Sequence, residues 1–324
     1  MVDPWRFQAH PEVWLLMLSL IASYVYMVRV IGPRAVPVGQ RAASTKQVAC
    51  FTAGIGLLWF GSDWPVHDIG EQYLYSAHML QHMIFSYFAP PLLLLSLPTW
   101  MARTLLGSGR TYKTASRMAK PIFAGIWFNA VIMVTHIPGM VNTSTENAVL
   151  HYSLHFVLVT AALMMWMPIC GPIQEWRLGP GGKCVYLFLM SVVPTVPAGW
   201  LTFAEGVVYT HYNVPVRVWG LSVTNDQQIA GAIMKLGGST FLWAIIIFVF
   251  FKRFGTGDEQ TSYVRPRGDD QQPLTYDQVT EAFGRSDPPS GANPTTGSTT
   301  GSAGSAGSAG SGSLPAEHPA RDER

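Results

Sequence analysis

Long apolar runs alternate with short polar connections up to about residue 254. Most of these runs approach the roughly 20 residues that a helix needs to cross a bilayer. They predict an all-α, polytopic membrane protein with seven transmembrane helices, at Val13–Val28, Gln47–Phe60, Ala77–Leu97, Pro121–Ile137, Ala148–Ile169, Cys184–Phe203 and Ile229–Phe251. The apolar part of the second run is short, because the sequence Gly61-Ser62-Asp63-Trp64-Pro65 ends it abruptly.

Lysine and arginine residues occur in alternate connections. The connections after spans one, three and five, together with the end of span seven, hold Arg29, Arg34, Arg41, Lys46, Arg103, Arg110, Lys113, Arg117, Lys120, Arg177, Lys183, Lys252 and Arg253. The connections after spans two and four hold none, and the one after span six holds only Arg217. Because short cytoplasmic loops collect positive charge, the distribution predicts an N-terminus outside and a C-terminus inside.

The composition agrees with a protein that lies in a lipid bilayer. The 324 residues are 48% hydrophobic and 12% charged, about half the charged fraction of an ordinary soluble domain. The basic residues fall into short clusters between apolar runs, so we expect no nucleic-acid partner. Beyond Gly255 the chain turns to Gly, Ser and Ala repeats with Pro, which cannot bury enough apolar area to fold. We therefore predict a transmembrane domain over residues 1–254 and a disordered cytoplasmic tail over residues 255–324.

Two pairs of histidines stand four residues apart, each at the start of an apolar run: His78 with His82, and His151 with His155. Residues four apart share one face of a helix, with Cβ atoms roughly 5–6 Å apart, and two imidazoles at that spacing can chelate one metal ion. Ionisable groups inside spanning helices are costly and are candidates for function by default. The alternative is that each pair satisfies its nitrogens with backbone groups and water.

The predicted topology places most histidines at one membrane face. His136 ends span four on the same side as the two pairs, and His67 and His211 lie in the outer connections, so seven of the nine histidines gather there. We predict one metal site in the outer leaflet, with His67 and His211 as additional candidates. Its ligands would come from His78, His82, His136, His151 and His155.

The donor types restrict the metal. Cys50, Cys170 and Cys184 fall at the predicted inner ends of their spans, where the cytosol keeps thiols reduced. Imidazoles without thiolates suit copper, zinc, nickel or haem iron, and methionine sulfur would narrow the choice toward Cu(I). Methionine also fills gaps in apolar cores; the candidates are Met79, Met83, Met133 and Met140. The groups that topology places to orient the rings are Gln81, Asp63, Asp68 and Asp226.

Two further residues inside spans need partners. Pro90 lacks the N–H that would bond the carbonyl of Ser86, and such a freed group in a membrane must be satisfied by a neighbour or by water. Lys235 lies inside span seven. It either snorkels toward the outer interface or pairs with Asp226 or Glu205.

Four motifs resemble one known family. The run His78-Met79-Leu80-Gln81-His82-Met83, followed by Pro90-Pro91-Leu92-Leu93-Leu94-Leu95, is similar to the multi-spanning CtaG family of cytochrome c oxidase assembly factors, found in bacteria with aa3- or caa3-type oxidases. The similarity continues at His151-x3-His155 leading to Trp166-Met167-Pro168, and at Asp226-Gln227-Gln228-x-Ala230-Gly231. It covers about residues 11–254.

The resemblance implies a multi-pass protein of the bacterial plasma (inner) membrane that associates with cytochrome c oxidase subunits and assists copper delivery to the catalytic subunit. We expect no enzyme activity, since the sequence has no HExxH motif and no Gly-rich phosphate loop. One alternative is a haem-binding electron-transfer protein with His82 or His155 as axial ligands. Another is a copper transporter, which would need a polar path to the inner face.

Overall fold

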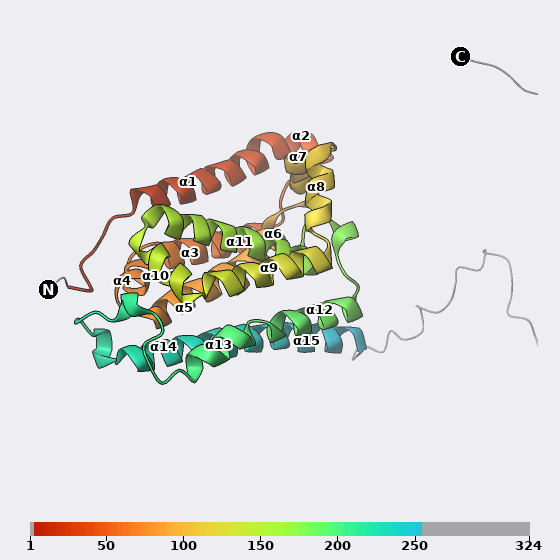
Figure 1. Cartoon of the computed structure of the whole chain (residues 1–324). Helices are drawn as coiled ribbons and strands as arrows, with labels where there is room; N and C mark the ends of the chain where they lie inside the picture. Colours follow the sequence, from red (N-terminus) through yellow and green to blue (C-terminus); the bar gives the residue numbers. More distant parts are fainter. Residues whose placement is uncertain (1–2, 255–324) are drawn as a thin grey trace, which may run out of the picture. The chain divides into compact units, whose positions relative to one another are not determined.

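The computed structural model describes residues 3–254, and over that range every regular element is helical (Figure 1). The predicted tail lies outside the described residues. The α-helices are α1 (Pro11–Tyr26), α2 (Gly32–Ala35), α3 (Thr45–Ser62), α4 (Val66–Gln72), α5 (Tyr75–Met83), α6 (Ala89–Ser96), α7 (Thr99–Leu106), α8 (Arg110–Met118), α9 (Pro121–Thr135), α10 (Pro138–Glu146), α11 (Ala148–Cys170), α12 (Pro180–Val192), α13 (Thr195–Thr202), α14 (Val223–Ala232) and α15 (Gly238–Phe254). Short 3₁₀ turns lie in the connections at Gln174–Trp176, Thr210–Tyr212 and Val218–Gly220.

Three π-helical turns join consecutive helices into longer rods. They are Met27–Ile31 between α1 and α2, Ile84–Phe88 between α5 and α6, and Ile233–Gly237 between α14 and α15. One such turn follows the first histidine pair directly and precedes Pro90. Turns of this kind insert an extra residue into a helix and often occur at functional sites.

Among the described residues, five helical rods are long and apolar enough to cross a membrane: Pro11–Ala35, Tyr75–Ser96, Ala148–Cys170, Pro180–Thr202 and Val223–Arg253. A sixth results if α8 and α9, which meet at a bend of 71°, count as one span. The second predicted span coincides with α3, whose first turn includes Lys46 and Gln47 and is therefore polar. The chain is a multi-pass membrane protein with five or six candidate spans; the seventh span and the orientation stay predictions.

The rod formed by α5 and α6 is the centre of the bundle. In its apolar window 72% of the residues are buried, against 17 to 44% in the other candidate spans. It packs against α3, α11 and α14, and α4 lies against its start. Met79, Phe85 and Leu94 are core residues of this rod. The first histidine pair therefore lies on the most enclosed helix of the described chain.

The two ends of the bundle differ in their short helices. Figure 1 shows α4 and α10 at one end, where α5, α11 and α14 begin, and α2, α7 and α8 at the other. We call the first of these the histidine end, because both histidine pairs lie in the opening turns of α5 and α11. The chain thus brings segments about 70 residues apart in sequence to the same end.

The carbonyl group freed by Pro90 is satisfied from another helix. The indole Nε1 of Trp166 on α11 donates to Ser86 O at 2.9 Å. Trp166 is only 1% exposed, so the bond is made in the interior of the bundle. Of the two predicted alternatives, a neighbour or water, the structure shows a neighbour, and the bond ties α11 to the central rod.

Helices α13 and α14 pack closely because Gly231 has no side chain. A Cβ atom at Gly231 would lie 2.7 Å from Ala198 O and 2.8 Å from Thr202 N, and backbone atoms cannot yield as a flexible side chain can. We predict that Gly231→Ala lowers the stability of the bundle by about 1–3 kcal/mol, the usual cost of overpacking. Thermal unfolding of the detergent-solubilised protein measures the change.

Gly199→Ala is the matched control for this substitution. Gly199 lies on the partner helix α13, and a Cβ atom there would meet no other atom within 4 Å. Alanine generally stabilises a helix interior relative to glycine, so the control should unfold at the same or a slightly higher temperature. Equal losses in the two variants would contradict the close packing of α13 and α14.

Candidate metal centre

The first histidine-bearing helix, α5, begins against a carboxylate from α14. Asp226 accepts hydrogen bonds from the backbone N–H groups of Tyr75, at 2.7 Å, and Ser76, at 3.0 Å, and from the Ser76 hydroxyl. The first N–H groups of a helix have no partner within it, and negative charge is favourable at that end. Asp226, which is 2% exposed, therefore fixes where α5 starts and so the position of His78 one turn later.

Helix α4 lies directly against the backbone of α5. A Cβ atom at Gly70 would be 2.9 Å from His78 N, so this approach requires glycine. His78 and His82 follow one another by one turn on α5, with ring centroids 4.5 Å apart. The short distance between α4 and α5 brings His67 of α4 within reach of the α5 residues.

The second histidine pair is positioned by the start of α11. Asn147 accepts a hydrogen bond from Leu150 N at 3.1 Å and so caps the helix. The rings of His151 and His155 are one turn further, with centroids 4.3 Å apart. Both pairs therefore take the i, i+4 arrangement that the sequence predicts.

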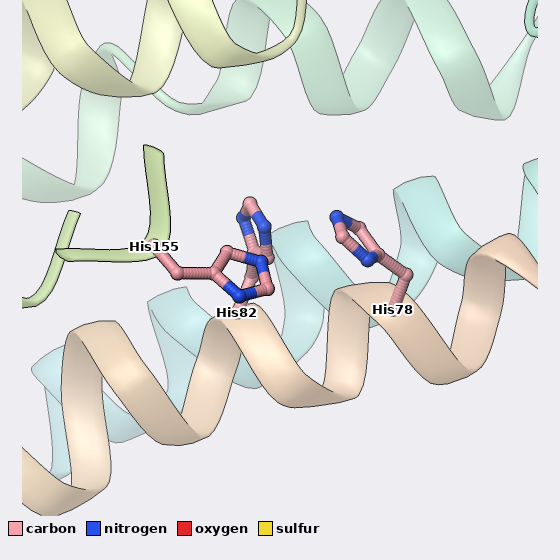
Figure 2. A group of neighbouring side chains, drawn as sticks. All are labelled: His78, His82 and His155. Atoms are coloured by element: carbon pink, nitrogen blue, oxygen red, sulfur yellow. The ribbon is translucent and has the colours of Figure 1, made fainter. Parts of the chain in front are cut away.

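The two pairs face one another between α5 and α11. The His155 ring centroid is 5.5 Å from that of His78 and 5.4 Å from that of His82, and Figure 2 shows the three side chains approaching from the two helices. One nitrogen of each ring lies within 4.8 Å of the others. We call His78, His82 and His155 the deep triad. Metal–nitrogen bonds of about 2.0–2.1 Å in a tetrahedral site place ligand atoms about 3.3 Å apart, so small ring movements would complete a coordination sphere.

A small cavity adjoins the deep triad. Its volume is about 20 Å³, which is enough for one water molecule or one ion. The cavity is lined by the deep triad and by Thr135, Val141, Ser144, His151 and Leu154. The space therefore suits a single metal ion with few ligands from outside the protein.

Imidazole nitrogens in this region are left without hydrogen-bond partners. Buried polar atoms are normally paired, and leaving one unpaired costs about 1–3 kcal/mol. Six such nitrogens occur in this region of the described chain: His67 Nε2, His78 Nδ1, His82 Nδ1, His136 Nε2, His151 Nε2 and His155 Nε2. Each neutral imidazole has one nitrogen with a lone pair, which is what a soft or borderline metal ion requires.

His136 borders the deep triad at the end of α9. Its ring centroid is 5.7 Å from that of His82. The Nδ1 atom donates to Ile132 O at 2.7 Å, which leaves the lone pair on Nε2. A ligating histidine is typically held by such a bond through its other nitrogen. The structure brings His136 next to the triad, and the bond leaves its Nε2 available to a metal.

A second group of donors lies nearer the rim of the bundle. His67 and Glu71 are one turn apart on α4, and His151 reaches them from α11. Glu71 Oε2 is 3.3 Å from His67 Nε2, and Glu71 Oε1 is 4.0 Å from His151 Nε2. All three donor atoms lie within 4.8 Å of one another. We call His67, Glu71 and His151 the rim triad.

Burial sets the protonation of the α4 donors. Burial, together with repulsion from the neighbouring His151 and His10, lowers the pKa of His67 to about 4. Burial also raises the pKa of Glu71, and repulsion from Asp68 acts in the same direction. His67 is therefore neutral at neutral pH, the form that binds metal ions.

The methionine candidates differ in their burial. Met79 and Met83 are buried in the hydrophobic core of the bundle. Met133 is 39% exposed on α9, and Met140 is half-buried on α10. The structure therefore does not bring Met133 to the triads, because α9 turns that face outward.

The predicted orienting residues have different partners. The Gln81 side-chain amide forms a hydrogen bond with His67 Nδ1 at 3.2 Å, so Gln81 does contact a ring of the rim triad. Asp68 binds His10 Nε2 at 3.2 Å, and Asp63 accepts hydrogen bonds from two tryptophan side chains. Neither carboxylate orients a ring of the triads. His211, predicted as an additional ligand, instead approaches the backbone of α4, with its Nε2 2.9 Å from the carbonyl oxygen of residue 71.

Two residues of this region were absent from the sequence prediction. Glu71 stands four residues after His67, so its helical spacing was a usable signal. His10 stacks edge-on against His67 with ring centroids 5.1 Å apart. Its approach depends on how the N-terminal segment folds back onto α4, which no spacing in the sequence indicates.

Lys235 takes no part in the histidine cluster. Its Nζ donates to Thr195 Oγ1 at 2.5 Å. Of the two alternatives for this residue, the pairing with Asp226 or Glu205 is therefore wrong, because the partner of Lys235 lies on α13.

We predict that Asp226→Asn destabilises the start of α5. An amide oxygen can replace only part of the acceptor capacity of the carboxylate, and hydrogen bonds to a charged group contribute about 1.5–3 kcal/mol. The variant should unfold at a lower temperature than the wild type in detergent. Glu205→Gln removes one carboxylate from an exposed position after α13 and serves as the control. An unchanged melting temperature in Asp226→Asn would contradict its role at the helix start.

A family comparison covers most of the chain. The model of the family described as cytochrome c oxidase caa3 assembly factor (Caa3_CtaG) matches residues 22–255. No curated protein and no solved structure gives a significant match. The matched range includes every residue of the deep triad and the rim triad, and it spans well over half of the 324 residues. The resemblance carried by the sequence motifs is thereby confirmed, and the chain belongs to the cytochrome c oxidase caa3 assembly factor family.

Proposed function

We propose that this assembly factor binds copper as its cargo at the deep triad and passes it to the catalytic subunit of the oxidase. The observation that carries the proposal is the group of six buried imidazole nitrogens without hydrogen-bond partners at one end of the bundle. A helix bundle in lipid gains nothing from orphaned imidazoles unless they have a ligand. The family supplies the context of oxidase assembly.

The donor set of the deep triad is compatible with copper. The deep triad offers three neutral nitrogens and no carboxylate, and imidazole ligands suit copper as well as zinc. Cys170 lies at the far end of α11, where its Sγ contacts the carbonyl groups of Pro91 and Trp166. It is therefore separated from the histidines by most of the length of the helix, and thiolate ligation plays no part in the proposal.

The distribution of charge supports an outward-facing histidine end. Helices α4 and α10 carry no lysine or arginine, whereas α2, α7 and α8 at the opposite end carry five. Those five are Arg34, Arg103, Arg110, Lys113 and Arg117. Because positive residues collect on the cytoplasmic side, the triads would face the outside, where copper for the oxidase would be received.

The two alternatives have less support. A haem between His82 and His155 would need a slot many times larger than the cavity of about 20 Å³ beside them. A transporter would need donor groups that continue toward the far end. Below the deep triad, the buried residues Phe85, Leu158 and Ala162 are apolar.

We predict that His82→Ala and His155→Ala each weaken Cu(I) binding by at least about tenfold, since even groups behind the ligands change metal affinity by 10–100-fold. Anaerobic titration of the purified protein against a chromophoric Cu(I) chelator measures the affinity. The double variant should add little to either single change, because members of one site are not additive. His318→Ala controls for loss of a histidine elsewhere.

The same variants should lower the copper content of the oxidase in cells. Cu(I) affinity that is equal in His82→Ala, His155→Ala and the wild type would overturn the proposal. If the variants lose Cu(I) affinity as expected but the oxidase in these cells is still fully metallated, the copper site stands and its role in delivery does not.

We predict that an impermeant thiol reagent labels Gly139→Cys on α10 and spares Gly109→Cys before α8. Both glycines are exposed, and a side chain at either meets no other atom within 4 Å, so the two positions are matched in structure. The background carries serine at Cys50, Cys170 and Cys184. The reverse labelling pattern would place the histidine end inside the cell and exclude receipt of copper from the outside.

A further inference from the structure

We propose that the rim triad of His67, Glu71 and His151 is a second metal site, one that binds a divalent cation of the zinc or Cu(II) class. It is separate from the deep triad in its ligands, since the two groups share no residue. The inference does not depend on copper binding at the deep triad. It rests on the geometry, burial and donor types of the rim triad itself.

The three donors converge from two helices. The carboxylate of Glu71 lies between the two imidazoles, 3.3 Å from His67 Nε2 and 4.0 Å from His151 Nε2. The edge of a tetrahedral site with metal–ligand bonds of about 2.0–2.1 Å is about 3.3 Å long. The arrangement is thus close to a coordination sphere and needs little movement of α4 or α11.

Both imidazole nitrogens are buried and unpartnered. His67 is 1% exposed and His151 is 2% exposed, and neither Nε2 atom has a hydrogen bond, although each lies near the Glu71 carboxylate. Two neutral rings aimed at one carboxylate without bonding it are poorly satisfied. A cation between them would satisfy all three groups.

Gln81 adds an independent indication. Its amide nitrogen faces His67 Nδ1 at 3.2 Å, while its Oε1 is buried without a partner. Rotating the amide by 180° exchanges the two atoms. Oε1 would then accept a hydrogen bond from the Nδ1–H group, and the lone pair of His67 would lie on Nε2, facing the rim triad. In many metal sites a residue outside the coordination sphere holds the ring of a ligating histidine through such a hydrogen bond.

The donor types indicate the class of ion. Two imidazoles with one carboxylate are the ligands of many zinc sites, and the anionic oxygen favours a divalent ion over Cu(I). Glu71 has a side chain that is 23% exposed, so an ion can reach the rim triad from the solvent. The deep triad, with its three neutral nitrogens, is more enclosed.

Zinc binding to the full-length protein in detergent tests the proposal. His82→Ala weakens the deep triad, so zinc binding by this variant that depends on Glu71 can be assigned to the rim triad. We expect the His82→Ala protein to bind one equivalent of Zn²⁺ in equilibrium dialysis, and His82→Ala/Glu71→Gln to bind it at least about tenfold more weakly. His82→Ala/Glu146→Gln is the matched control, because Glu146 is an exposed acid on α10 at the same end.

A second measurement guards against loss of folding. His82→Ala protein loaded with one equivalent of Cu²⁺ should show a paramagnetic resonance spectrum with two coupled nitrogens. Adding Glu71→Gln should change that spectrum while the elution volume in gel filtration is unchanged. Zinc affinity that is the same with and without Glu71 would overturn the proposal, as would a wild-type protein that binds no Zn²⁺. Neither result would bear on Cu(I) binding at the deep triad.

Discussion

An imidazole that leaves water for the interior of a bundle in lipid must find new partners for both of its nitrogens. In this protein that constraint applies to several histidines at once, within a region where ring centroids are 4.3 to 6.5 Å apart. Backbone carbonyl groups satisfy some of the nitrogens, as Ile132 does for His136. The remaining nitrogens point at one another and at Glu71. Buried nitrogens without hydrogen-bond partners cost free energy unless a cation binds them. The packing that brings these nitrogens together is therefore linked to function.

The packing of the bundle holds these rings in place through backbone contacts. Asp226 fixes the start of α5, and the absence of a side chain at Gly70 lets α4 lie against it. Trp166 binds the carbonyl of Ser86 and so fixes α11 against the central rod. Each contact joins elements far apart in the sequence. Together they place histidine side chains from α4, α5, α9 and α11 at one end of the molecule with little freedom to separate.

The two triads differ in their donor groups and in their exposure to solvent. The rim triad contains a carboxylate and is partly open to solvent, whereas the deep triad consists of neutral rings around a small cavity. His151 and His155 lie one turn apart on α11, so the two groups are adjacent without sharing ligands. A family role in oxidase assembly gives this pair of sites a common context.

The sequence by itself determined the helical class, the membrane setting, the family and the i, i+4 pairs, because apolar length, charge alternation and helical spacing are local properties. It did not determine the number of spans. Helix α3 coincides with a predicted span, but its polar first turn lowers its mean hydropathy and it is not among the candidate spans of the structure. Only the tertiary structure divided the histidines into two groups, placed Asp226 on the backbone of α5 rather than on a ring, and added Glu71 and His10. These outcomes depend on which faces of distant helices meet, and that is decided by close contacts such as those at Gly70 and Gly231.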